Sequence, residues 1–537
     1  MKRGPDVFSF GKKGNEIEWK LLVFLVLMMN VKLVVKLAAI VFIFFLQPNF
    51  KFGFRWHNTR LPLFYLSVIA IAVINFIIGR NFSQHYSLVV LTGILFWTVS
   101  ILAIHQVKLL VDRSAILVLH NTLLVFFVIN IILSFLNLSA ILFEIGWRNP
   151  FQYQGQYQKY FLNTGDYIKG VSFDTSTTNA AINCFAIVYF LYRQKYGLVL
   201  AAMIVLLMTA SNYSILVMLI VFAGMFLFNS RKEQKSIIAV CILFLAIFFA
   251  KLSPQNDSYV LETVNNFLIK KRRPFIAPEK IIPIRDRPDS LLTPETRKEQ
   301  IAILYLDSIE RERLKRIPFA EQKRTQTRPA LPHDSIHTAS YQWKRDTTAF
   351  QRQLIAYLNN RTLNDTVVFE KEVTGKMLSY KQSYQFLKSH PAKILLGDGT
   401  GNFSSKLAFR ATGLQMAGGF PANFTYSNPD FLNNHLRLYA HFFSQNAESH
   451  SIIHNPDSTY DQLLTEYGLI GLIAFPALYI GFFVKQLKKL SDGLPILVSL
   501  LFFLLVNYSF EQLSVVVLFE LIMFINIKEQ HQISSHE

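Results

Sequence analysis

The stretch HNPDSTYDQLLTEYGLIGLIAF, residues 454–475, decides how the chain is organised. Its first part is polar and begins with a titratable imidazole, and its second part opens the apolar run that starts at Tyr467. Asn455 suits an N-cap, Pro456 suits the first helical position and Asp457 complements the helix dipole. We therefore expect a helix to begin here and to continue into a membrane.

The composition is that of a membrane protein. Of 537 residues, 52% are hydrophobic and 17% are charged, and the apolar residues come in blocks. Cys184 and Cys241 both lie inside apolar runs, so they form neither a disulfide framework nor a thiolate metal cluster. The formal charge of +19 would suggest nucleic acid for a soluble protein, but short basic loops retained in the cytoplasm account for much of it. The expected partner is a lipid bilayer, with no nucleic acid.

Eleven apolar runs approach the length of about 20 residues that crosses a bilayer. They are residues 20–47, 61–79, 86–104, 115–137, 178–192, 196–211, 212–228, 236–252, 466–484, 493–509 and 512–527. The first is over-long and carries Lys32 and Lys36, so it is either one tilted helix or an interfacial helix that leads into a shorter span. The expected fold is an all-α, polytopic integral membrane protein with 11–12 transmembrane helices and a large, mainly helical extracytoplasmic loop domain.

Charge predicts the orientation of three domains: transmembrane helices in residues 1–252, the loop domain in 253–465, and transmembrane helices in 466–537. The basic clusters at residues 231–235 and 485–489 are expected to be cytoplasmic, which places the loop domain outside. Counting back through the spans then places the basic N-terminus outside as well. This conflict predicts a miscounted span in the first apolar run. Within the loop domain, residues 270–345 have a charge-rich composition typical of loosely ordered chain.

His454 lies just before the expected helix start. There the partial positive charge of the helix disfavours imidazolium, which leaves a neutral ring able to accept a proton. The same exposed N–H groups favour a phosphate. A histidine beside a helix start is also a common neighbour of a cap, so spacing alone does not assign it.

Three motifs resemble the bacterial O-antigen ligase and O-antigen polymerase superfamily. Residues 454–475 are similar to its His-Asn pair, leucine-rich helix and Glu-x-Gly-Leu-x-Gly entry into a membrane helix. Residues 395–403, LLGDGTGNF, look like its Gly-x-Gly-x-Gly-Asn-Phe element, and residues 173–181, FDTSTTNAA, are a weaker match to an Asn-containing motif. One departure is Ser211-Asn212, where relatives often carry Ser-Arg.

The resemblance implies a metal-independent glycosyltransferase, without a cofactor, in the bacterial inner membrane. It would transfer or polymerise glycan from a polyprenyl-pyrophosphate carrier onto an acceptor hydroxyl on the external side, in the synthesis of lipopolysaccharide or another surface polysaccharide. The acceptor is a lipid A core sugar for a ligase and another carrier-linked unit for a polymerase, and both stay open because the motifs are shared.

The resemblance also implies roles for residues in this site. His454 would be the general base, and a cationic pocket with backbone amides would stabilise the departing pyrophosphate. The residues implied to bind substrate are Asn455, Arg410, Lys406, Gly397, Gly399 and Asn402. Lys381 and Lys388 are further candidate cations, and Asp398, Asp457 and Asp461 are candidate partners of His454.

Two alternatives remain beside this function. A flippase for lipid-linked glycans predicts inverted repeats and functional charges midway through the membrane. A non-catalytic assembly subunit would use the loop domain to bind partners. Glu466 lies about 18 Å from His454 along a continuous helix, which favours a structural role for it. The histidines are not spaced with carboxylates as metal ligands, and the sequence leaves the oligomeric state open.

Overall fold

The computed structural model describes most of the chain, and all of the described residues belong to one compact unit. They are residues 16–30, 32–55, 58–145, 149, 168–172, 176–228, 231–252, 374–413, 419–439, 455–486 and 492–536. His454, the first residues of the 173–181 motif and the charge-rich residues 270–345 lie outside the described residues.

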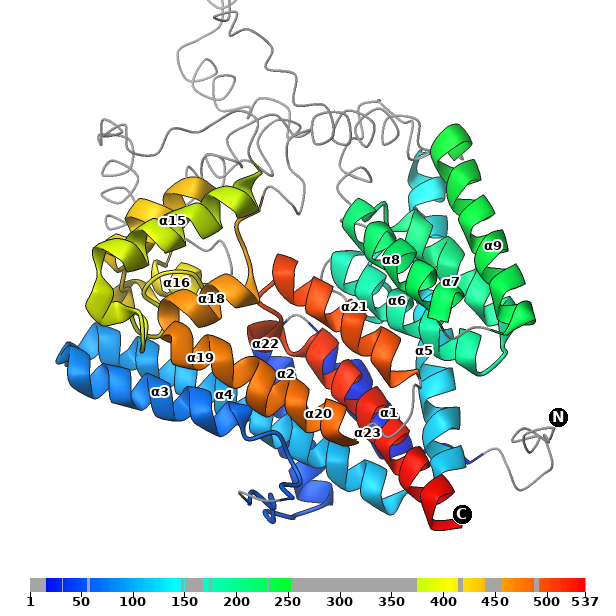
Figure 1. The fold of residues 1–537 in the computed structure, drawn as a ribbon, viewed down its shortest axis with the longest axis horizontal. Coiled ribbons are helices and arrows are strands. Elements are labelled where there is room, and N and C mark those ends of the chain that lie inside the picture. The colour runs from blue at the N-terminus through cyan, green and yellow to red at the C-terminus, as the bar shows by residue number, and fades with distance from the viewer. Residues whose placement is uncertain are drawn as a thin grey trace, which may run out of the picture. The chain divides into compact units, whose positions relative to one another are not determined.

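Every described element of secondary structure is a helix, and no strand occurs in these ranges (Figure 1). The apolar helices are α1 (Trp19–Met28), α2 (Leu33–Leu46), α3 (Phe64–Gly79), α4 (Gln84–Arg113), α5 (Ile116–Ile145), α6 (Ser176–Tyr192), α7 (Tyr196–Met208), α8 (Asn212–Phe228), α9 (Lys232–Ile247), α19 (Gly468–Ala474), α20 (Gly481–Gln486), α21 (Gly493–Val506) and α23 (Ser514–His536). Shorter or more polar helices are α15 (Gly375–Ser389), α16 (Lys406–Ala411), α18 (Thr459–Glu466) and α22 (Ser509–Gln512). The 3₁₀- and π-helical turns are η2 (Gly170–Ser172), η3 (Phe248–Leu252), η6 (Pro391–Lys393), η7 (Ala422–Phe424), η8 (Phe431–Leu436) and η10 (Phe475–Ile480).

Four helical segments are long and apolar enough to cross a membrane. They are Gln84–Arg113, Ile116–Phe143, Lys232–Leu252 and Gly468–Gln486. The helices α1, α2, α3, α7, α8 and α21 are also apolar but shorter. The described residues are therefore all-helical, as expected, and they include four helices that could cross a membrane by length and composition.

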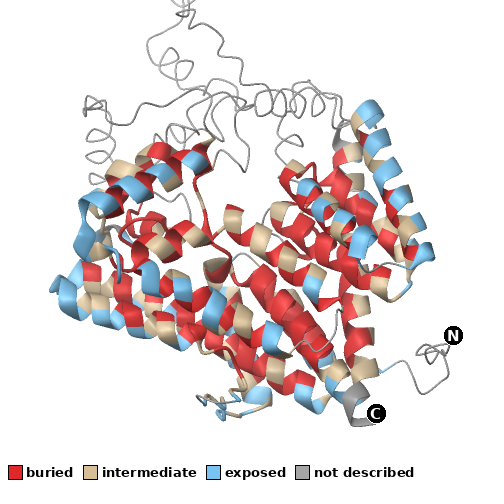
Figure 2. Ribbon diagram, viewed as in Figure 1, coloured by how far each residue is buried: buried red, intermediate tan, exposed pale blue. Residues whose placement is uncertain are grey.

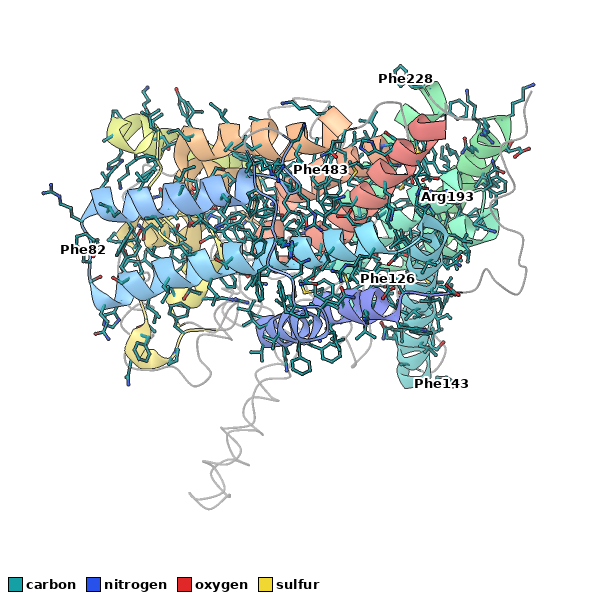
Figure 3. The ribbon with its side chains drawn as sticks, turned by 90° about the horizontal axis from the view of Figure 1, so that it is seen from below. Phe82, Phe126, Phe143, Arg193, Phe228 and Phe483 are labelled. Atoms are coloured by element: carbon teal, nitrogen blue, oxygen red, sulfur yellow. The ribbon has the colours of Figure 1, made fainter. Side chains whose placement is uncertain are left out.

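The outer surface of the helices carries large apolar side chains. Phe82, Phe143 and Phe228 lie at its edges and are 61%, 70% and 81% exposed, whereas Phe126 and Phe483 are buried (Figure 3). Exposed residues are frequent on α9, while α6 and α23 are mostly buried (Figure 2). Large exposed apolar surface marks a contact with lipid or protein rather than with water, and here it lies on both the long and the shorter apolar helices.

The first apolar run forms two helices that return on themselves, not one tilted helix. The Glu18 N–H, before α1, donates to Thr122 Oγ1 of α5 (2.9 Å), and Ser514 Oγ at the start of α23 donates to the Met28 carbonyl at the other end of α1 (3.3 Å). Beyond the break, Lys36 Nζ of α2 donates to Ser514 Oγ (3.1 Å), and His105 of α4 contacts the Asn49 carbonyl after α2 (2.7 Å).

Both outer ends of the α1–α2 pair therefore lie near the last turns of α4, because Ser114, directly after α4, also donates to Glu18 (3.4 Å). The two helices form a hairpin, and the chain enters α1 and leaves α2 at the same end of that hairpin. The first apolar run thus forms two helices where it was counted as one span.

The helix expected to have Asn455 as its N-cap begins three residues later, at Thr459, with Ser458 as the N-cap residue. The Asn455 side chain instead accepts the N–H of Asp457 (3.2 Å) and donates to its carboxylate (3.1 Å), a local turn that competes with helix formation. The prediction of a continuous helix into the apolar run is also wrong, because the helix is interrupted at Gly468, between α18 and α19.

The break at Gly468 is a close crossing of two backbones. Gly468 has φ +69°, and a Cβ there would lie 2.3 Å from the Leu395 carbonyl oxygen. The first amides of α19 are satisfied from the same segment, since Leu469 N–H donates to Ile394 O (2.8 Å) and Ile470 N–H to Leu395 O (3.2 Å). Residues 394–397 thus occupy the place that a preceding helical turn would fill.

Polar segments from the loop domain pack on the ends of α3, α4 and α19, which lie side by side (Figure 1). Asn75 near the end of α3 donates to the carbonyl oxygens of Leu396 (2.8 Å) and Gly397 (3.2 Å). A Cβ on Gly93 of α4 would lie 2.3 Å from the Thr400 methyl group. The loop that resembles the family's glycine element is therefore held directly against the apolar helices.

Gly468→Ala is predicted to destabilise the protein by at least about 2 kcal/mol, because it adds strain at positive φ to a clash with backbone. The measurement is the thermal unfolding midpoint of the purified protein in a fixed detergent. Gly224→Ala in α8 is the control, since a Cβ there meets nothing within 4 Å. Equal midpoints for the two variants would contradict the backbone crossing.

Candidate functional site

The glycine element, residues 395–403, encloses the carboxylate of Glu466. Glu466 Oε2 accepts the Gly401 N–H (2.8 Å), and Oε1 accepts the N–H groups of Phe403 (3.3 Å) and Ser404 (3.1 Å). The Gly399 N–H donates to the Glu466 carbonyl (3.2 Å). Converging amides of this kind form an anion-binding concavity, and here the chain's own carboxylate occupies it.

The remaining implied residues of the loop are also engaged within the chain. The Gly397 N–H donates to Lys393 O (2.8 Å), so Gly397 and Gly399 do not offer their amides to a pyrophosphate. Asn402 Nδ2 donates to Tyr86 OH (3.0 Å), and Asn402 Oδ1 accepts the Tyr426 hydroxyl (3.1 Å). These three residues shape the loop. Glu466 is bound by backbone amides of the chain, which is a structural role of the kind that the sequence favoured for it.

Arg410 and Lys406 of α16 face a buried carboxyl rather than open space. Burial lowers the pKa of Arg410, and the charge of Glu511 in α22 opposes that shift. Burial raises the pKa of Glu511 to about 7, against the opposing charges of Arg410 and Lys406. Glu511 also accepts the Leu407 N–H (3.0 Å) and the Gln462 side-chain amide (2.7 Å). Arg410 and Lys406, the two cations implied to bind phosphate, thus share Glu511 as a titratable counterion.

Asp398, a candidate partner of His454, pairs with a lysine of the same loop. Its Oδ1 lies 2.5 Å from Lys393 Nζ, which also contacts Asp430 Oδ2 (3.1 Å). Burial raises the pKa of Asp398 to about 7, although the Lys393 ammonium opposes the shift. Asp398 therefore ties the glycine element to η6 and the start of η8.

The segment that follows His454 is held by a buried lysine. Lys376 Nζ in α15 donates to the carbonyl oxygens of Asn455 (2.9 Å) and Asp457. Burial lowers the pKa of Lys376 to about 7, and the carboxylates of Asp457 and Asp461 only partly offset that effect. This contact fixes the backbone one residue after the implied base.

Asp461 of α18 receives three hydroxyl groups in the interior of this site. Ser379 Oγ (2.7 Å) and Ser383 Oγ (2.5 Å), four residues apart on one face of α15, donate to it, as does Ser404 Oγ (3.2 Å). Ser404 Oγ is also 3.3 Å from the Tyr508 hydroxyl, between α21 and α22.

A histidine from η8 completes the cluster. His435 Nε2 lies 2.6 Å from the Tyr508 hydroxyl and 3.7 Å from Asp457 Oδ1, and the side chain is 1% exposed. Asp457 and Asp461 thus lie near a histidine, but that histidine is one the sequence analysis did not single out.

Sequence reasoning missed Lys376, His435, Tyr508 and Glu511. None lies in the three motifs, and each meets its partners only through contacts between distant segments. The one available signal was the acidic residue inside the polar break between the apolar runs 493–509 and 512–527, where Glu511 lies.

The third motif contributes a buried amide network elsewhere. Asn179 Oδ1 of α6 accepts from Asn130 Nδ2 of α5 (2.9 Å) and from Asn183 Nδ2 (2.9 Å), while Asn179 Nδ2 donates to Ser134 Oγ (3.0 Å). These hydrogen bonds join α5 to α6, while Asn183 Oδ1 has no hydrogen-bond partner among the described residues. Asn212, the position at which the resemblance predicted arginine, is the first residue of α8.

Comparison of the chain with known protein families and with curated proteins finds no match. In the part of the chain that the structure describes, no three His, Cys, Asp or Glu side chains are grouped to hold a metal ion.

Lys376→Met is predicted to cost about 1–3 kcal/mol, because two buried carbonyls lose their donor. The pH dependence should change as well. Folding lowers the pKa of Lys376 from 10.5 to about 7, so between those values the unfolded chain binds more protons and stability rises with pH.

The measurement is the unfolding midpoint of wild type and Lys376→Met at pH 7 and pH 10, with exposed Lys381→Met as the control. Wild type should gain stability relative to Lys376→Met as the pH rises. An identical pH dependence in the two proteins would contradict the buried lysine.

Proposed function

We propose that the protein is a membrane glycosyltransferase that moves glycan from a polyprenyl-pyrophosphate carrier to an acceptor hydroxyl, of the O-antigen ligase or polymerase type. One observation carries the proposal: a buried cluster of carboxylates, hydroxyls, a histidine and a lysine lies where the polar segments meet the ends of the apolar helices. A lipid-linked glycan presents its reacting bond at such a boundary.

The distribution of basic residues supports an external position for this cluster. Lys528 near the end of α23 donates to the carbonyls of Val111 (2.7 Å) and Ser114 (2.6 Å), so the ends of α4 and α23 lie together. Arg193 after α6 pairs with Glu529 at the same end (2.6 Å). Basic loops are retained in the cytoplasm, so the opposite end, which holds the Asp461 cluster, faces outward. The α1–α2 hairpin then leaves the basic N-terminus on the cytoplasmic side.

In the proposed reaction the protein mainly supplies a general base and a cationic pocket. The proton of the acceptor hydroxyl goes to a general base, for which the resemblance implies His454. Arg410 and Lys406 balance the charge that develops on the pyrophosphate. Because Glu511 already faces them, the leaving group competes with a carboxyl of pKa about 7 for the same cations.

The test is to supply the purified protein, in lipid nanodiscs, with a carrier-linked glycan and candidate acceptors. A ladder of products indicates a polymerase, and a single addition to lipid A core indicates a ligase. His454→Ala should lower the rate at least about 100-fold. His531→Ala is the matched control, because His531 is an exposed residue near the end of α23.

An absence of product with every acceptor would contradict the proposed chemistry. Full activity of His454→Ala would contradict the assignment of His454 as the base.

One observation favours the flippase alternative. Glu520 of α23 is a buried carboxyl among apolar helices and accepts the hydroxyls of Tyr65 (2.5 Å) and Tyr479 (3.1 Å). Charged groups inside a membrane are costly and often mark a transport path. Transport of a fluorescent lipid-linked glycan across vesicles that is abolished by Glu520→Gln, without product formation, would favour a flippase.

A further inference from the structure

His435 has one ring nitrogen in a hydrogen bond and one without. The η8 turn places the ring against Phe409, with centroids 5.6 Å apart, and directs Nε2 to the Tyr508 hydroxyl (2.6 Å). Nδ1 is buried and has no hydrogen-bond partner among the described residues. A buried, unpartnered nitrogen is unfavourable unless a proton or a ligand group reaches it.

When all the contacts around Tyr508 are made at the same time, one nitrogen of His435 has to carry the proton. Asp461 accepts three hydroxyls, and an ionised carboxylate is an acceptor only. Ser404 has a single proton, which goes to Asp461, so its oxygen accepts the Tyr508 hydroxyl (3.3 Å). The Tyr508 oxygen then accepts from His435 Nε2–H.

The relay therefore leaves the lone pair on Nδ1. In a neutral imidazole one nitrogen donates and the other accepts, and the bond made by one sets the role of the other. The chain of donors runs from His435 through Tyr508 and Ser404 to the Asp461 carboxylate.

A second carboxylate is set to stabilise the protonated ring. Asp457 Oδ1 lies 3.7 Å from His435 Nε2, too long for a hydrogen bond but close enough for charge attraction in a buried site. Lys376 faces Asp457 and Asp461 from α15 and is the opposing charge in this group.

We propose that His435 is a second proton acceptor of the site, which takes up through Nδ1, from the general base, the proton that the acceptor hydroxyl loses. This inference rests on the proposed function. The O–H bond of the acceptor breaks and its proton moves through the general base to Nδ1, while the oxygen forms a bond to the anomeric carbon. The bond from that carbon to the pyrophosphate breaks, and the pyrophosphate leaves with the electron pair.

The chemical test compares three variants of the nanodisc protein in the glycan-transfer assay. His435→Gln keeps a donor for Tyr508 but has no basic nitrogen, and kcat should fall about 100-fold with little change in KM. Tyr508→Phe breaks the relay and should also lower kcat. Tyr460→Phe is the control, because it loses only a hydrogen bond to the Leu501 carbonyl and should keep wild-type kcat.

A second readout does not depend on activity. Nitrogen-15 NMR of labelled histidines, with His435→Gln used to assign the signal, should show an unprotonated Nδ1 and a protonated Nε2. Tyr508→Phe should change that tautomer. The reverse tautomer in wild type, or unchanged kcat in folded His435→Gln, would overturn the inference. An absence of product from wild type would instead overturn the proposed function.

Discussion

The site depends on the burial of Glu466 within the glycine element. Its carboxylate has no cation as a hydrogen-bonding partner among the described residues, and the three N–H groups of Gly401, Phe403 and Ser404 replace the water that it lost. Burial raises the pKa of Glu466 to about 8, and the amide hydrogen bonds oppose that shift, because hydrogen bonds to a charged acceptor are about twice as strong as neutral ones. The glycines serve this arrangement, because Gly397 and Gly401 approach neighbours that a Cβ would meet at 2.4 Å and 2.5 Å.

The same interaction sets the chemistry around it. Binding the Ser404 amide places the Ser404 hydroxyl between Asp461 and Tyr508, so the structural carboxylate positions the proton relay. The helix that follows, α16, carries Arg410 and Lys406 towards Glu511. The groups that we propose for catalysis and substrate binding thus depend on an element whose contacts lie within the chain.

The sequence predicts the helices well and the site only in part. Long apolar runs have few alternatives to helix, and each run in the described ranges is helical. The break at Gly468 was not predictable, because the apolar pattern continues through it and its cause is a backbone contact with Leu395, far away in the sequence. The helix does not start at Asn455 because the asparagine side chain forms a local turn with Asp457. Residue preferences at helix caps do not distinguish such a turn from a helix start.

The glycine element shows why a sequence motif does not identify the group that it binds. Its spacing predicted backbone amides that bind an anionic group, and the group they bind is the carboxyl of Glu466, 65 residues after Gly401. His435 was missed for a similar reason, since its partners Tyr508 and Asp457 come together only in the fold.

The most direct test of the account is hydrogen exchange, followed by mass spectrometry, of residues 395–405 in Glu466→Gln. At a pH above about 8, where the Glu466 carboxyl is ionised, we expect exchange at least about 10-fold faster at Gly401, Phe403 and Ser404 in the variant, because a neutral amide accepts more weakly and presents its own N–H groups to the loop. Exposed Glu233→Gln should leave that exchange at the wild-type rate. Unchanged protection in Glu466→Gln would contradict the claim that this carboxylate organises the site.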